Sequence, residues 1–172
     1  HDVGVYCLQA LLDAGMYIDL VITHDDDPNE NIWFGSVAKL CQENHIPYEI
    51  VERDQLLKLL PRLIALSPDY IFSFYYRFMI PAELLKVPKL AALNMHGSLL
   101  PKYRGRAPVN WAVLHGEVET GATLHVMEAK PDAGDIVDQI AVPIEIHETA
   151  HDVFNKVSNA AKRVIERVLP KL

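Results

Sequence analysis

Three side chains suited to acyl-transfer chemistry stand in two short stretches of this chain. Asn94 and His96 open the run from Asn94 to Pro101, and Asp132 stands in the sequence Asp132-Ala133-Gly134. An amide can donate hydrogen bonds to an oxyanion, an imidazole can move a proton, and a carboxylate can orient and charge that imidazole. The three residue types form a workable set for acyl transfer if the fold brings the two stretches together.

The spacing within the first stretch supports a shared site. Residues 91–95 have the composition of a β-strand, and side chains alternate between the two faces of a strand. We therefore expect Asn94 and His96 on the same side. Structural roles stay open at this point: His96 could cap a strand end, Asn94 could satisfy backbone groups, and Asp132 lies in a turn-like sequence where aspartate is usually structural.

A basic loop follows the first stretch. It contains Lys102, Tyr103, Arg104 and Arg106, and it ends at Pro108. Three cations beside a tyrosine could bind phosphate groups or stack on a planar base. A basic loop that simply faces solvent is the alternative.

Apolar periodicity predicts the elements that would position these residues. Expected helices cover 6–14, 34–44, 54–66, 81–86, 108–115 and 150–169, and expected strands cover 17–23, 46–51, 69–75, 91–95, 122–127 and 136–144. Pro61 should kink or split the third helix. Strands that alternate with helices predict an α/β, Rossmann-like fold with a mostly parallel sheet covered on both faces. In such sheets ligands bind beyond the carboxyl ends of the strands, where Asn94 and His96 would stand.

Composition limits the classes of function. The 172 residues are 50% hydrophobic and 23% charged, which indicates one soluble domain over residues 1–172 with a sizeable core. We expect no signal peptide and no membrane span, and Cys7 and Cys41 without metal spacing favour the cytoplasm. A net charge of −7 disfavours nucleic acid as a partner. The remaining histidines lack ligand spacing, so we expect no metal site.

Several motifs resemble the folate-dependent formyltransferase superfamily over essentially the whole chain. They are Asn94, the run His96-Gly97-Ser98-Leu99-Leu100-Pro101 and the late Asp132-Ala133-Gly134. Further stretches are similar to the branch that acts on sugar amines, most closely to the formyltransferase domain of the bifunctional enzymes that process UDP-4-amino-4-deoxy-L-arabinose and UDP-glucuronate for lipid A modification. These stretches are 23–25, 35–38, 67–69, 75–77 and 103–111.

The resemblance implies a function and a set of site residues. The formyl donor would be N10-formyltetrahydrofolate, and the acceptor would be the amine of a nucleotide-linked amino sugar, with UDP-4-amino-4-deoxy-L-arabinose as the expected one. Catalysis would fall to Asn94, His96 and Asp132. Cofactor contacts would come from Phe78, Met79, Ile80, Arg106, Glu128, Ala129, Lys130, Pro131 and Asp132, and substrate contacts from Lys102 and Tyr103.

The mechanism that we expect is direct transfer without a covalent enzyme intermediate. The amine attacks the formyl carbon, and Asn94 with a protonated His96 stabilises the charge on the formyl oxygen. Asp132 would favour the charged imidazole, because an adjacent carboxylate raises its proton affinity. The proton that the amine loses then reaches N10 of the folate through His96 or a water molecule.

Other interpretations remain open. Methionyl-tRNA formyltransferase, another sugar N-formyltransferase and a formyltetrahydrofolate hydrolase are alternatives within the superfamily, and an inactive folate-binding module is the alternative outside catalysis. The resemblance also places a short apolar strand before residue 1 and a β-rich domain after the last helix, and we expect both to be absent from these 172 residues. A homo-oligomer or a fused second domain is compatible with the sequence.

Overall fold

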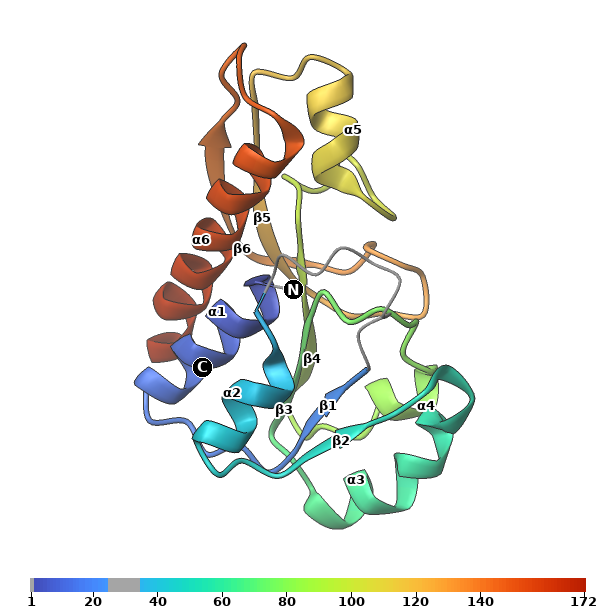
Figure 1. Cartoon of the computed structure of the whole chain (residues 1–172). Helices are drawn as coiled ribbons and strands as arrows, with labels where there is room; N and C mark the ends of the chain where they lie inside the picture. The colour runs from blue at the N-terminus through green and yellow to red at the C-terminus, as the bar shows by residue number, and fades with distance from the viewer. Residues whose placement is uncertain (1, 25–34) are drawn as a thin grey trace.

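Helices and strands alternate along most of the chain (Figure 1). The computed structural model describes residues 2–24 and 35–172. Its elements, in order, are α1 (Asp2–Asp13), β1 (Val21–Thr23), α2 (Val37–Glu43), β2 (Tyr48–Ile50), the 3-10 helix η1 (Arg53–Leu59), α3 (Leu60–Leu66), β3 (Tyr70–Phe74), α4 (Ala82–Leu85), β4 (Ala91–His96), α5 (Pro108–Leu114), β5 (Glu119–Val126), β6 (Ile136–Pro143), α6 (Ala150–Val168) and the 3-10 helix η2 (Leu169–Lys171).

The predicted elements are present, with shifted boundaries. The first helix begins at Asp2, earlier than predicted, and the first strand covers only Val21–Thr23. Pro61 does split the third helix: a 3-10 helix ends at Leu59, and Pro61 lies in the first turn of α3, where its missing N–H costs nothing. The start of the predicted helix 34–44 and the acidic run 25–27 lie outside the described residues.

The described strands form a two-stranded sheet, β1-β2, and a four-stranded sheet in the order β3-β4-β5-β6. β1 pairs parallel with β2, and β3 pairs parallel with β4, which confirms the α/β, Rossmann-like class. β4 and β5 are antiparallel, and so are β5 and β6. A loop without a helix joins β5 to β6, and such a short connection suits antiparallel neighbours.

A gap separates β1 from β3. In the described part of the chain, β1 pairs only with β2, and β3 pairs only with β4. A cavity of about 620 Å³ lies between them, and its lining comes from both strands, from Leu8 and Leu11 of α1 and from Leu63 of α3. A strand of the kind that the resemblance places before residue 1 would fit such a gap, and that placement stays a prediction.

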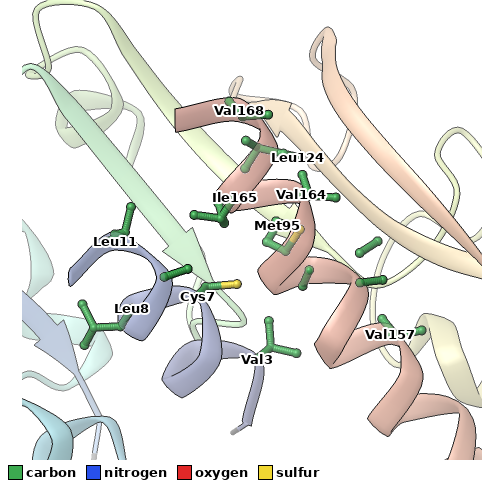
Figure 2. Close-up of a cluster of buried hydrophobic side chains, with 14 of the residues drawn as sticks. Val3, Cys7, Leu8, Leu11, Met95, Leu124, Val157, Val164, Ile165 and Val168 are labelled. Carbon is green, nitrogen blue, oxygen red and sulfur yellow. The ribbon is translucent and has the colours of Figure 1, made fainter. Parts of the chain in front are cut away.

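The main core lies between the sheet and the pair α1 and α6 (Figure 2). Met95 of β4 and Leu124 of β5 lie beside apolar side chains of α6 in Figure 2, and Ile165 of α6 is fully buried there. A capping box between Thr149 and Asp152 starts α6. No described helix combines the length and the apolar character needed to cross a membrane.

Candidate active site

Asn94 and His96 lie at the carboxyl end of β4 and share one face of the sheet. β5 continues this polar face, because its register sets His125 opposite Asn94 and Thr123 opposite His96. Met95 points to the other face and is 1% exposed in the core. The predicted alternation is therefore what places the amide and the imidazole together.

The loop between β5 and β6 returns Asp132 to the same face. Met127 N–H donates to Ala92 O of β4 at 2.8 Å, and Val126 N–H donates to Asp135 O at 2.9 Å, so both ends of the loop are held. A Cβ at Gly134 would collide with the Val126 carbonyl, which makes glycine necessary there. These anchors bring the two motif stretches together.

Asp132 lies between two imidazoles. Its Oδ1 is 3.5 Å from His96 Nδ1 and 3.5 Å from His125 Nε2, and its Oδ2 accepts the Gly105 N–H at 2.9 Å. Burial works to raise the pKa of Asp132, but the contact with His125, the Gly105 hydrogen bond and the electrostatic influence of His96 and His125 outweigh it and lower the pKa. The carboxylate is therefore charged at neutral pH.

His96 is buried, and one of its two ring nitrogens has a hydrogen-bond partner in the backbone. Nε2 lies 2.8 Å from Tyr103 O, and because a carbonyl can only accept, Nε2 carries a proton. In the neutral imidazole Nδ1 is then unprotonated and faces Asp132. Burial lowers the pKa of His96; the Tyr103 carbonyl and Asp132 raise it, His125 lowers it, and the net shift is downward.

Burial sets the direction of this shift. Asp132 acts on the pKa of His96 in the predicted direction, but the side chain is only 6% exposed and burial, which disfavours the charged form, acts most strongly. His96 is neutral at neutral pH before a substrate arrives.

His125 is a member of the cluster that sequence analysis left without a role. Its Nδ1 lies 2.8 Å from Val126 O and so carries a proton. In the neutral ring Nε2 then accepts from Asn94 Nδ2, at 3.1 Å. This contact fixes the orientation of the Asn94 amide and leaves its second N–H for another acceptor. The sequence signal was weak: a histidine within an apolar strand.

Two buried hydroxyls hold the loop that follows β4. Thr123 Oγ1 donates to Ser98 O at 2.7 Å and accepts from Leu100 N–H at 3.2 Å. Ser98 Oγ donates to Lys102 O at 2.6 Å. Both hydroxyl residues are 0% exposed. The loop is thus fixed up to Tyr103, whose carbonyl meets His96.

The side chains of the predicted substrate residues are engaged with other protein groups. Lys102 Nζ is 3.1 Å from Glu117 Oε2, and Tyr103 Oη donates to Glu117 Oε1 at 2.8 Å. Arg106 is exposed on the same loop. The structure thus brings this loop to the cluster, and it adds Glu117 as a partner that the sequence did not suggest.

The other predicted cofactor residues lie outside the hydrogen-bonded cluster. Phe78 packs on Tyr76 and His24, with ring centroids 5.7 and 6.0 Å apart, and Met79 is 59% exposed. Residues 128–131 are exposed on the loop that carries Asp132. Within the described residues, no group of three or more histidine, cysteine, aspartate or glutamate side chains is arranged to hold a metal ion.

Gly97 provides a test of the packing beside His96. A Cβ there would collide with the hydroxyl of Tyr75. Gly97→Ala should lower the free energy of unfolding by about 1–3 kcal/mol, as overpacking does. Tyr75→Phe should leave this free energy unchanged or raise it, because the buried hydroxyl has no hydrogen-bond partner in the described structure. The double variant should recover part of the loss in urea unfolding; full additivity would contradict the collision.

The charge of His96 can be tested by its own titration. We expect the His96 ring to titrate below the ordinary histidine pKa, and Asp132→Asn to lower this pKa further, because the carboxylate favours the imidazolium. NMR of ring protons against pH, assigned with His96→Gln, measures both values. A pKa that rises in Asp132→Asn would contradict the proposed balance of burial and charge.

Comparison with known proteins gives the family. A family model described as formyl transferase matches residues 7–169, nearly the whole chain. Among solved structures, glycinamide ribonucleotide transformylase 1 from Symbiobacterium toebii superposes with a TM-score of 0.83 at 20% identity, over 99% of this chain and 83% of that one.

Two further solved structures cover other activities. A formyltetrahydrofolate deformylase from Pseudomonas syringae pv. tomato has a TM-score of 0.81 at 22% identity, over 95% of this chain and 56% of that one. An N-formyltransferase from Helicobacter canadensis, in complex with folinic acid and dTDP-3-aminofucose, has a TM-score of 0.77 at 28% identity, over 98% of this chain and 60% of that one. The match over residues 7–169 shows that the chain belongs to the formyl transferase family.

Proposed function

We propose that this enzyme transfers the formyl group of N10-formyltetrahydrofolate to the amine of a nucleotide-linked amino sugar, with UDP-4-amino-4-deoxy-L-arabinose as the expected acceptor. The observation that carries the proposal is the cluster of Asn94, His96, His125 and Asp132, which joins an amide donor, a neutral base and a charged carboxylate on one sheet face. A module that only binds folate has no need of a proton-transfer set.

In the proposed reaction the protein groups act in sequence. The amine nitrogen bonds to the formyl carbon, and the free N–H of Asn94 donates to the oxygen as negative charge builds on it. The nitrogen, now positive, gives a proton to Nδ1 of neutral His96, and Asp132 stabilises the resulting imidazolium. The bond between the carbon and N10 then breaks, and N10 receives the proton from His96.

The surrounding loops supply binding roles in this proposal. Arg106, the backbone of residues 78–80 and the stretch 128–132 would bind the folate, as the sequence resemblance implies. Lys102 and Tyr103 would contact the acceptor, although in the free enzyme both side chains are held by Glu117. In this proposal both side chains keep their contacts with Glu117 when the acceptor binds.

The choice of a sugar amine rests on two supports. One is the sequence resemblance in the loop from Tyr103 to Trp111. The other is the similarity to the N-formyltransferase that was solved with folinic acid and dTDP-3-aminofucose, at 28% identity. Transformylation of glycinamide ribonucleotide is the second candidate, because several structures of that activity share the fold at 18–22% identity.

A panel of acceptors tests the proposal. Release of tetrahydrofolate from N10-formyltetrahydrofolate is followed by absorbance with UDP-4-amino-4-deoxy-L-arabinose, dTDP-3-aminofucose, glycinamide ribonucleotide, methionyl-tRNA or no amine. Release that depends on a sugar nucleotide is expected. Release that depends only on glycinamide ribonucleotide or on tRNA would replace the acceptor, and release without any amine would indicate a hydrolase.

Substitutions in the cluster should reduce turnover by amounts that follow from their roles. We expect Asn94→Ala to lower kcat by about 10²–10³-fold, as loss of an oxyanion donor does. We expect His96→Ala to lower it by about 10²–10⁴-fold, as loss of a proton-transfer group does. The exposed Asn159 and His147 offer matched alanine controls that should keep wild-type kcat. Near-normal turnover in His96→Ala would rule out its role in proton transfer.

A further inference from the structure

A carboxylate outside the proposed chemistry fastens the loop that follows β4. Oε1 of Glu117 accepts from Tyr103 Oη at 2.8 Å, and its Oε2 lies 3.1 Å from Lys102 Nζ. His115 Nδ1 lies 3.2 Å from the same tyrosine hydroxyl. Glu117 is in turn fixed to α5, since its N–H donates to Ala112 O at 3.0 Å. The Glu117 carboxylate thus anchors the side chains of Lys102 and Tyr103.

Tyr103 links the Glu117 carboxylate to the imidazole of His96. Its hydroxyl donates to Glu117, while its carbonyl accepts the Nε2 proton of His96 at 2.8 Å. The backbone of Tyr103 has a φ of +54°, in the left-handed region that residues other than glycine rarely adopt. Such a conformation persists only where the surroundings fix it, and the two hydrogen bonds fix it from opposite ends.

We propose that Glu117 is a positioning residue for His96. By holding the Tyr103 hydroxyl, it keeps the Tyr103 carbonyl where it accepts the Nε2 proton, so that Nδ1 remains the unprotonated nitrogen and faces Asp132. The proposal rests on the function proposed above, in which His96 takes the amine proton at Nδ1. Glu117 itself touches neither substrate nor reacting atoms.

The effect of Glu117 reaches His96 through Tyr103 and not through its charge. The groups that face His96 are Asp132 from the β5–β6 loop, His125 from β5 and the Tyr103 carbonyl. The hydrogen bond from Tyr103, then that from Lys102, lower the pKa of Glu117, so the carboxylate is charged at neutral pH and paired with Lys102. Because Lys102 and the solvent screen the charge of Glu117, this charge acts only weakly on His96.

Loss of the hydrogen bond between Glu117 and Tyr103 has a defined consequence for the His96 imidazole. The Tyr103 carbonyl is one of the groups that raise the pKa of His96. If the carbonyl moves away, this pKa falls further, and the neutral ring is free to carry its proton on Nδ1, facing Asp132. That tautomer cannot accept the amine proton at Nδ1. The rate of transfer should fall even where the acceptor still binds.

The test combines spectroscopy with kinetics. The ring nitrogens of ¹⁵N-labelled histidine report the tautomer, and we expect only the Nε2–H form of His96 in the wild type. Glu117→Ala and Tyr103→Phe should each show a mixture of tautomers and a lower His96 pKa, and each should lower kcat by between about tenfold and 100-fold. The double variant should be no worse than either single one, because both break the same hydrogen bond.

A matched control and separate readouts keep the outcomes distinct. Glu119→Gln removes an equal charge from an exposed position two residues away and should change neither tautomer nor kcat. In Glu117→Ala, a raised KM for the acceptor with an unchanged His96 spectrum would make Glu117 a substrate contact and overturn the proposal, as would wild-type tautomer and kcat in that variant. If that variant fails to fold by circular dichroism, Tyr103→Phe decides alone. If the wild type transfers no formyl group, the proposed function fails, while the His96 tautomer still tests whether Glu117 positions the Tyr103 carbonyl.

Discussion

Burial of the His96 imidazole is the constraint on which the rest of the site depends. For a ring that is 6% exposed, a nitrogen without a hydrogen-bond partner is costly, because the ring lies away from water. The Tyr103 carbonyl accepts from Nε2–H, and Asp132 can accept from Nδ1 once that nitrogen takes up a proton. Tyr103 and Asp132 belong to two different loops, so the environment of the His96 side chain depends on the conformation of both loops.

The sheet makes this arrangement possible by separating two kinds of side chain. One face of β4 and β5 carries Asn94, His96, Thr123 and His125, while Met95 and its neighbours on the other face pack under α1 and α6 (Figure 2). The apolar face supplies the stability of the strands. The polar face is thereby rigid, which lets hydrogen bonds orient the Asn94 amide and the His96 ring before a substrate binds.

Local patterns in the sequence predicted much of this. Strand alternation placed Asn94 and His96 on one side, Pro61 marked the break before α3, and the late Asp132 was assigned from its motif. Relations between distant segments could not be predicted. The role of His125 depends on the register of an antiparallel pair, and that of Glu117 on a contact between a loop and the end of α5. The charge of His96 depends on burial, which motifs do not reveal.

The central claim is that a neutral His96, beside Asp132, lets an amine take the formyl group directly. Its most direct test follows the formyl carbon itself, with N10-[¹³C]formyltetrahydrofolate and an amino-sugar nucleotide observed by ¹³C NMR. Direct transfer predicts that the label moves from the folate to a formamide on the sugar nitrogen, and that Asp132→Asn slows this step. Label that appears as formate, or that remains on the folate with a folded protein, would contradict it.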